Sequence, residues 1–201
     1  MAKFGKSFRK SETGGISFLP KGVLDTAVDI FSALNKKRIR YMAIGAFPVN
    51  VYGRNRTSRD LDIAILLRKS SEFETLFPQS RYKMIDPDCV NERTRVARVR
   101  DKKTGILIDV ILKPEEFTFS RNTFGRRVKV RIGNTIGYIP SVEDYLISKL
   151  KAGRAGTPDF QDVVTTLINN RDAIDWEYLE NRAKEENKLY LLRYYKDAIS
   201  K

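Results

Sequence analysis

The stretch from Gly45 to Asp62 reads GAFPVNVYGRNRTSRDLD and holds most of the information about the fold. The apolar run Tyr41–Ile44 just before it is typical of a short buried strand. Residues 46–52 predict a short helix, because a proline is tolerated in the first turn of a helix. Residues 54–59 predict a polar loop, and residues 60–67 predict a second strand.

The rest of the chain predicts strands in the middle and helices toward the end. The other expected elements are helices at 24–38 and 70–77, strands at 93–100, 106–112, 127–132 and 136–139, and helices at 141–152, 158–170, 175–186 and 188–199. This order indicates an α+β fold with a mixed sheet flanked by helices. We expect a flexible basic tail at 1–20, an α/β domain at 21–140 and a small helical domain at 141–201.

Composition excludes several classes of protein. The 201 residues are 41% hydrophobic, which is enough to form a core. The chain has no histidine, so no imidazole base or ligand is available, and its single cysteine excludes an internal disulfide or a zinc cage built on cysteines. No apolar run approaches the ~18 residues needed to span a bilayer, and no apolar segment of a signal peptide follows the basic start. We therefore expect a cytoplasmic protein without membrane contact.

The positive charge is concentrated in the first two thirds of the chain. The formal net charge is +13, and residues 141–201 hold 10 basic and 11 acidic residues, so the whole excess lies in residues 1–140. Such an excess indicates a polyanionic partner, either nucleic acid or nucleotide phosphates. The alternative is that the charge only keeps the protein soluble, or reflects the Lys, Arg and Glu usage of thermophiles.

Three aspartates on predicted strands are the candidate chemical groups. Asp60 and Asp62 share one face of their strand, because side chains alternate along a strand. Asp109 is a lone acid in the otherwise apolar segment 106–112, and a buried unpaired carboxylate is costly. Pairing with arginines could satisfy them, but three strand carboxylates without a histidine favour a site for Mg²⁺, or Mn²⁺, which takes oxygen ligands and leaves positions open for phosphates.

Residues upstream of the aspartates are suited to phosphate. Gly45 follows a strand and opens a predicted helix, whose free backbone N–H groups favour an anion. The following loop carries three arginines and two hydroxyl side chains, namely Arg54, Arg56, Arg59, Thr57 and Ser58.

Taken together, these residues resemble the signature of the minimal nucleotidyltransferases of the polymerase-β-like superfamily. The matching positions are Gly45, Arg56, Ser58, Asp60, Asp62 and Asp109. Ala46 stands where the pattern has Gly or Ser, which removes a side-chain hydroxyl but leaves the backbone in place. The segment from Ile139 to Asp162 also looks like the AbiEii-type branch of that superfamily, and the resemblance covers about residues 22–170.

The resemblance implies a nucleotidyltransferase-like fold and a metal-dependent reaction. Asp60, Asp62 and Asp109 would hold two divalent ions, and a nucleoside triphosphate such as ATP would bind at Gly45, Ala46, Arg56, Ser58 and Asp162. An acceptor hydroxyl then attacks the α-phosphorus and pyrophosphate leaves. Asp109 is the candidate to take the proton of that hydroxyl. RNA, tRNA or a protein would be the acceptor, and an antitoxin could be the partner, as for some relatives.

Lys149 admits two interpretations. It lies on the apolar face of its predicted helix, so its side chain could simply extend outward to solvent. In the branch that the chain resembles, the matching lysine contacts the triphosphate or the catalytic carboxylates. Asp159 and Asp162, three residues apart on the next helix, could orient Lys149 or the acceptor, or belong to an ordinary solvated face.

A second basic group could bind the acceptor. Arg127, Lys129 and Arg131 alternate with apolar residues, which predicts a strand with a cationic face for RNA. Arg93, Arg95, Arg98 and Arg100 change parity between Arg95 and Arg98, which predicts a bulge or bend. The competing hypothesis is a catalytically inert nucleotidyltransferase fold that binds nucleic acid or a protein partner, although the chain keeps all three aspartates.

Overall fold

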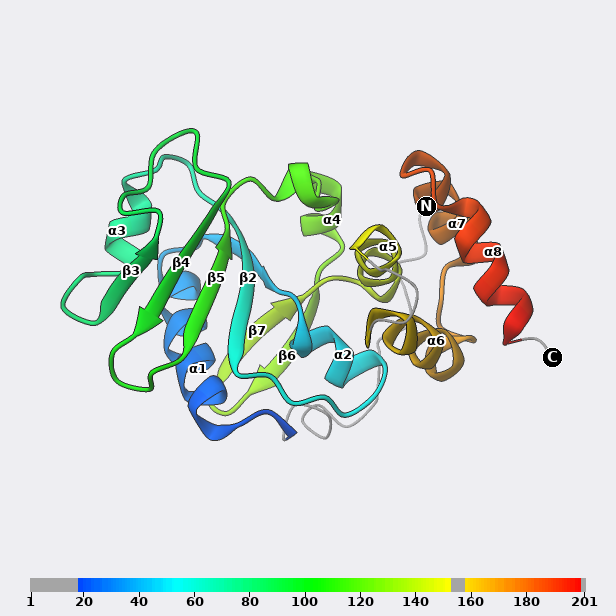
Figure 1. The fold of residues 1–201 in the computed structure, drawn as a ribbon, viewed down its shortest axis with the longest axis horizontal. Coiled ribbons are helices and arrows are strands. Elements are labelled where there is room, and N and C mark those ends of the chain that lie inside the picture. The colour runs from blue at the N-terminus through cyan, green and yellow to red at the C-terminus, as the bar shows by residue number, and fades with distance from the viewer. Residues whose placement is uncertain (1–17, 153–157, 200–201) are drawn as a thin grey trace.

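The computed structural model describes residues 18–152 and 158–199, so most of the predicted tail at 1–20 lies outside the described residues. Its centre is a five-stranded mixed sheet with the order β1-β2-β5-β4-β3 (Figure 1). The strands are β1 (Arg40–Ala43), β2 (Asp60–Leu66), β3 (Tyr82–Asp86), β4 (Val96–Asp101) and β5 (Leu107–Ile111). β2 and β5 are parallel, and the other three pairings are antiparallel.

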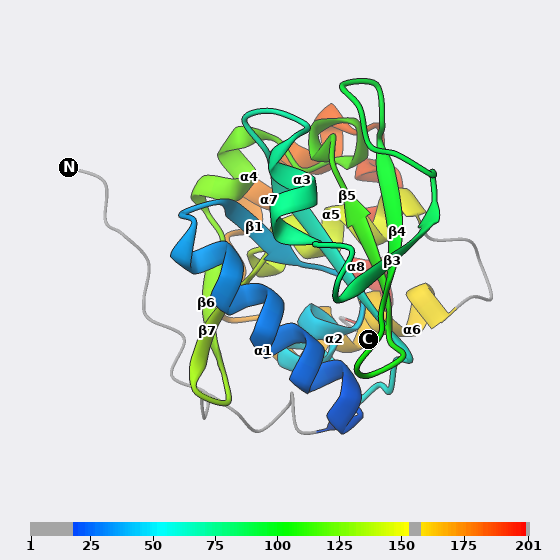
Figure 2. The ribbon, with the colours of Figure 1, turned by 90° about the vertical axis from the view of Figure 1, so that its left-hand side faces the viewer.

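Helix α1 (Lys21–Lys36) covers one face of the sheet, which we call the inner face (Figures 1 and 2). The apolar side chains of α1 at Val23, Ala27, Phe31 and Leu34 are fully buried there. Leu61, Ile63 and Ile65 of β2 belong to the same core, because alternate residues of a strand point to one face. The residues between them in the sequence point to the opposite face of the sheet, which we call the outer face.

The outer face is covered only in part. Met42 and Ala64 pack there against Phe119 and Phe124 in a small second core. The cover comes from the segment after β5, which contains the 3-10 helix η2 (Pro114–Phe117) and α4 (Arg121–Gly125). Half-buried polar positions of β2 and β5 lie on the rest of this face. This is where the predicted aspartates are found.

The remaining strands form a separate two-stranded hairpin of β6 (Val128–Ile132) and β7 (Thr135–Ile139). The hairpin packs against α1 and β1. Tyr41 of β1 stacks edge-on against Tyr138 of β7, with ring centroids 5.5 Å apart. Since Tyr41 lies on the inner face beside Phe31, the hairpin extends the inner side of the sheet.

Four helices follow the hairpin and occupy the right side of Figure 1. They are α5 (Val142–Ala152), α6 (Pro158–Asn170), α7 (Trp176–Glu185) and α8 (Leu189–Ala198). α5 and α6 pack against α2 (Ala46–Tyr52), and one continuous core joins these helices to the sheet. α3 (Glu72–Leu76) lies at the other end of the molecule (Figure 1). None of the described helices is long and apolar enough to cross a membrane.

Most predicted elements are confirmed, within a few residues at their ends. The strand expected at 93–100 begins only at Val96, because Asn91 and Thr94 close a turn in which the Asn91 side chain accepts from Arg93 N. The bulge predicted between Arg95 and Arg98 is wrong, since the irregular register lies in β3, between Met84 and Asp86. β3, η2 and α4 were not predicted at all.

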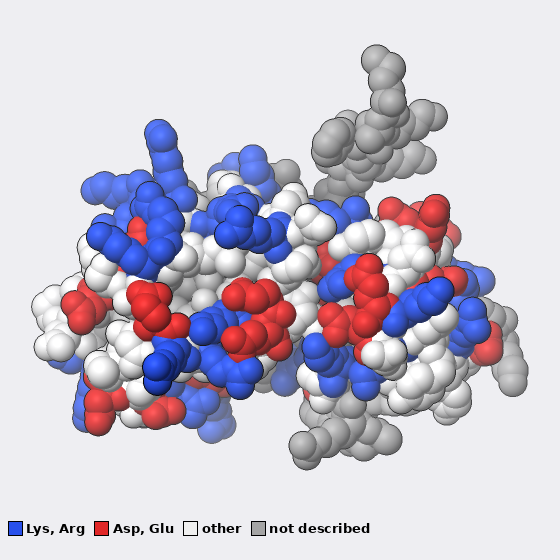
Figure 3. Space-filling view, turned by 90° about the horizontal axis from the view of Figure 1, so that it is seen from above, with Lys and Arg blue, Asp and Glu red and all other residues white. Residues whose placement is uncertain are grey.

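The surface charge is mixed on the face drawn in Figure 3. Lysines and arginines gather there in several groups, and aspartates and glutamates lie between them. Several glutamates of the described residues form ion pairs with an arginine or lysine, among them Glu72, Glu116 and Glu186. A net charge of +13 therefore does not make this face uniformly basic.

Candidate functional site

The three predicted aspartates lie side by side on the outer face of the sheet. In the parallel pair of β2 and β5, Asp62 is directly opposite Asp109. Asp60 lies two residues before Asp62 and therefore shares its face. The structure thus brings together two carboxylates of one strand and one of its neighbour.

The crowding of the three carboxylates disfavours the charged form of Asp62. Burial raises the pKa of Asp62 to about 6, and the neighbouring charges of Asp60 and Asp109 add to the increase. The positive charges of Lys149 and Arg56 act in the opposite direction and lower the pKa. Both cations are therefore close enough to affect Asp62, but they do not cancel the increase in its pKa.

Gly45 lies against the same aspartates at the start of α2. Its φ is 62°, a conformation that residues with a side chain rarely adopt. The preceding Ile44 donates its backbone N–H to the carbonyl of Asp62 at 2.9 Å, which holds the turn beside β2. Ala46 follows as the first residue of α2 and is buried. The predicted phosphate-binding turn is thus next to the carboxylates.

The loop from Gly53 to Arg59 is fixed by Asn50, a residue that the sequence did not single out. The Asn50 side-chain amide donates to the carbonyls of Ala46 and Arg56, at 2.8 and 2.7 Å. Its oxygen accepts from the Arg56 backbone N–H at 3.0 Å. Farther along the loop, the Ser58 hydroxyl donates to Asp60. Asn50 therefore sets the position of the loop relative to α2 and β2.

Asp162 of α6 is the buried partner of the loop arginines. Its side chain is fully buried, and it accepts from Arg54 Nε at 2.9 Å and from Arg56 NH1 at 2.8 Å. Lys149 Nζ lies 3.2 Å from the same carboxylate. One aspartate thus joins the loop before β2 to two helices of the C-terminal part.

Lys149 does not extend to solvent. Its side chain is only 11% exposed, and its ammonium group lies 2.5 Å from Asp159 Oδ1. The ammonium also contacts Asp162 and lies 5.8 Å from the centre of the Tyr145 ring. Asp159 and Asp162 therefore orient Lys149 together, as one of the two interpretations predicted.

Arg98 is a further residue of the site. It lies directly opposite Asp109 in the antiparallel pair of β4 and β5. Its Nε and NH2 donate to the two oxygens of Asp109, at 2.5 and 2.7 Å. The sequence placed Arg98 in a group of basic residues for the acceptor. The sequence feature that could have indicated the contact with Asp109 is that the two residues lie on consecutive strands of one hairpin.

The donor chemistry of the site suits a hard divalent cation, and one ligand is engaged elsewhere. Asp60 and Asp62 offer carboxylate oxygens on one face, and their mutual repulsion favours a cation. Asp109 is bound by Arg98 instead. Among the described residues, no group of three Asp, Glu, His or Cys side chains is arranged so that it could hold a metal ion.

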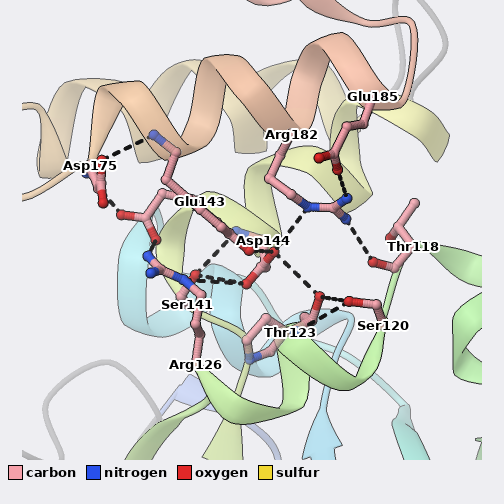
Figure 4. A network of polar contacts seen from close by, with 12 residues as sticks. Thr118, Ser120, Thr123, Arg126, Ser141, Glu143, Asp144, Asp175, Arg182 and Glu185 are labelled. Carbon is pink, nitrogen blue, oxygen red and sulfur yellow. Dashed lines mark hydrogen bonds and ion pairs between the residues drawn. The ribbon is translucent and has the colours of Figure 1, made fainter. Parts of the chain in front are cut away.

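A second buried polar cluster joins α4, α5 and α7, and Figure 4 shows Asp144 at its centre. Asp144 accepts from Ser141 Oγ at 3.1 Å and from Tyr178 OH at 2.9 Å, and Arg182 Nε lies 3.7 Å away. Burial nevertheless raises the pKa of Asp144. Tyr178 and Arg182 come from a distant segment of the chain, so no local pattern in the sequence indicates this cluster.

The predicted acceptor residues lie on the β6–β7 hairpin. Arg127 stacks over the Tyr138 ring at 4.5 Å and donates to the Phe124 carbonyl, so its guanidinium is engaged. Lys129 and Arg131 are exposed on β6. The hairpin that carries them packs on α1 and β1, and none of the three residues has a contact with Asp60, Asp62 or Asp109 among the interactions of the described residues. Their role in acceptor binding stays a prediction.

Comparison with known families gives one match, over residues 55–197. The family model is described as "Nucleotidyltransferase of unknown function (DUF6036)". Its range includes Asp60, Asp62, Asp109, Lys149 and Asp162. Comparison with the curated proteins gives no significant sequence match.

Solved structures show the same fold. They include an antigenic nucleotidyltransferase-like protein from Paracoccidioides brasiliensis, with 18% identity, coverage of 75% of this chain and 78% of that chain, and a TM-score of 0.53. A crystal structure of ANT(2")-Ia in complex with adenylyl-2"-tobramycin has 13% identity, coverage of 83% and 98%, and a TM-score of 0.56. The lincomycin-bound lincosamide antibiotic adenylyltransferase LnuA has 12% identity, coverage of 74% and 96%, and a TM-score of 0.50.

Proposed function

The chain belongs to the DUF6036 family of nucleotidyltransferases, and from this premise we propose that it is a metal-dependent enzyme acting on a nucleoside triphosphate. It transfers the nucleoside monophosphate to an acceptor hydroxyl and releases pyrophosphate. The observation that carries the proposal is the register of β2 and β5, which places Asp62 opposite Asp109 with Asp60 on the same face.

In this proposal Asp60 and Asp62 hold Mg²⁺ or Mn²⁺, and Asp109 completes the ligand set. The raised pKa of Asp62, caused by burial and by the two neighbouring carboxylates, supports a cation at this place. When bound, such ions stabilise charge on the attacking and leaving oxygens of a phosphoryl transfer. Asp109 lies on β5 next to β2, and in this proposal it also accepts the proton of the acceptor hydroxyl.

The phosphates of the nucleotide are proposed to bind between Gly45, the loop before β2, and Lys149. The backbone of Gly45 lies beside Asp62, and Ser58 contacts Asp60, so both reach the proposed metal ligands directly. Arg56 and Lys149 supply positive charge that already acts on Asp62. Asp162 holds both cations in position through its buried carboxylate and is a positioning residue.

The acceptor is proposed to be RNA, for example tRNA, or a protein with a free hydroxyl. The excess of basic residues supports a polyanion. One structure of similar fold is named as a lincosamide antibiotic adenylyltransferase, and another is a complex with adenylyl-2"-tobramycin. The test must therefore distinguish RNA and protein acceptors from a small-molecule acceptor. An AbiEii-type relationship with an antitoxin partner is a further hypothesis, supported by the sequence resemblance from Ile139 to Asp162.

The test is transfer of α-labelled nucleotide in Mg²⁺ to total RNA, to protein, and to a panel of aminoglycosides and lincosamides. Asp60→Asn and Asp62→Asn should abolish transfer while the protein stays folded. Asp25→Asn is the control, because Asp25 is an exposed aspartate on α1 and removes the same charge. If the wild type transfers no nucleotide to any acceptor while still binding RNA or protein, the inert binding module is the correct alternative.

A further inference from the structure

Asp109 is held by a cation of the chain itself. The pairing of β4 with β5 places Arg98 opposite Asp109, and the pairing of β5 with β2 places Asp62 on the other side. The Arg98 guanidinium binds both carboxylate oxygens of Asp109, at 2.5 and 2.7 Å. Asp109 therefore lies between an arginine and the two aspartates of the proposed metal site.

The ion pair between Arg98 and Asp109 is exposed enough to separate at a small cost in free energy. The side chains are 50% and 24% exposed, respectively, so water can replace either partner. Pairs of this exposure contribute only about 0–1 kcal/mol to the free energy of unfolding. The buried pairs of Asp162 and Asp101 are different, because their carboxylates are fully buried. Breaking the contact between Arg98 and Asp109 therefore changes the free energy of unfolding only slightly.

A divalent cation bound by Asp109 would need the same carboxylate oxygens that Arg98 contacts. Each oxygen of Asp109 accepts from one nitrogen of Arg98, so the guanidinium covers the carboxylate edge that an ion would use. Arg98 also lies close enough to interact electrostatically with Asp60 and Asp62. A second cation placed among these carboxylates would meet the positive charge of Arg98 at short range, and like charges repel.

We infer that Arg98 blocks Asp109 in the unloaded protein and exchanges places with a divalent cation, after which its guanidinium binds the phosphates of the nucleotide. This inference rests on the proposed function for the metal and the nucleotide. A planar guanidinium binds phosphate as well as it binds carboxylate, so the released side chain keeps an anionic partner. The site then loads the ion and the nucleotide together rather than the ion alone.

The test measures Mn²⁺ binding by the electron spin resonance of free Mn²⁺, without any turnover. Arg98→Gln should lower the Kd of Mn²⁺ in the absence of nucleotide by about 3–10-fold, the equivalent of roughly 1 kcal/mol. Arg100→Gln is the matched control, because Arg100 lies two residues along β4 on the same face and contacts the Gly105 carbonyl instead. The Kd of Mn²⁺ for Arg100→Gln should equal the Kd for the wild type.

A second arm separates competition from general electrostatics. In an Asp109→Asn background, Arg98→Gln should no longer change the Mn²⁺ affinity, because the contested carboxylate is gone. A non-hydrolysable nucleoside triphosphate should increase Mn²⁺ affinity more in the wild type than in Arg98→Gln, since only the wild type gains the contact with phosphate.

The outcomes are distinct. An unchanged or higher Kd for Arg98→Gln, with normal Mn²⁺ binding by the wild type, overturns the blocking role and leaves the proposed function in place. Equal effects of nucleotide on both proteins overturn the contact with phosphate. If neither protein binds Mn²⁺, the proposed metal site fails together with this inference.

Discussion

Gly45 leaves no room for a side chain beside Asp62: a Cβ atom added to Gly45 would lie 2.0 Å from Asp62 Oδ2. The φ of Gly45 is also positive, at 62°. Two independent constraints therefore require glycine at the turn where β1 passes into α2, and one of them, the close approach, involves a carboxylate of the proposed metal site.

Gly45→Ala should abolish most of the nucleotide transfer and lower the free energy of unfolding by more than the ~1–2 kcal/mol that a positive φ alone costs. Gly105→Ala is the control, because Gly105 has a φ of 75° but nothing within 4 Å of its added Cβ. Chemical denaturation of both variants separates strain from collision. Equal losses of stability, with normal transfer by Gly45→Ala, would contradict the close approach to Asp62.

Asp62→Asn should stabilise the metal-free protein at pH 8 and have little effect at about pH 3.5, below the ordinary pKa of an aspartate. The pKa of Asp62 is raised to about 6, so the folded state binds the proton more tightly than the unfolded chain. Stability therefore falls as the pH rises from about 4 to about 6, by roughly 3 kcal/mol at most. The variant has no such charge and should lose this decrease. Thermal unfolding at both pH values in a chelator tests it, and a lower Tm for the variant at pH 8 would refute it.

Asn50→Ala should cost about 2–3 kcal/mol of stability and raise the KM for the nucleotide, because the loop with Arg56 and Ser58 loses its anchor. Asn169→Ala removes one exposed hydrogen bond to the Gly53 carbonyl, at the start of the same loop. That control should cost less than about 1 kcal/mol. Urea denaturation and initial rates check both, and similar KM values for the two variants would show that the loop needs no anchor at Asn50.

Asp162→Asn should destabilise the protein by about 3–5 kcal/mol, because it removes the buried countercharge of Arg54, Arg56 and Lys149. Asp159→Asn should cost far less, since Asp159 is 27% exposed and Lys149 keeps its contact with Asp162. Guanidinium denaturation gives the two free energies. Comparable losses would mean that burial of Asp162 has little energetic effect.

RNA binding, if the acceptor is RNA, should weaken with salt by about 0.7 log units for each contacted phosphate of a single strand. Lys129→Glu with Arg131→Glu should reduce that slope and leave nucleotide binding unchanged, because both side chains are exposed on β6 and neither belongs to the proposed nucleotide site. Filter binding over a range of salt concentrations measures the slope. An unaltered slope would remove the hairpin from the acceptor site.

The sequence predicts those parts of the fold that depend on local pattern. The bounds of α2 follow from Pro48 and the two flanking glycines, and the face shared by Asp60 and Asp62 follows from the alternation in β2. β3 escapes prediction because it has only one buried side chain, Tyr82, and therefore no alternation. α4 has only five residues, fewer than two turns, so its apolar residues show no helical period.

The candidate site is predictable in its members but not in its pairings. The side-by-side placement of Asp62 and Asp109 depends on the parallel register of two strands that are far apart in the sequence. The partner of Asp109 likewise depends on the register of β4, which local pattern assigned to the wrong starting residue. The burial of Asp162 against Arg54 and Arg56 needs the packing of α6 on α2, and no local signal encodes that contact.

The position of Asp162 has a consequence for the order of events during synthesis. Every strand of the sheet precedes α6 in the sequence and is synthesised before it, and until α6 has been made the loop arginines have no buried countercharge. N-terminal parts of a chain generally fold first as they emerge. The nascent protein therefore passes through a stage in which its sheet can form before the loop arginines have their buried partner, which becomes available only after residue 162 has been added.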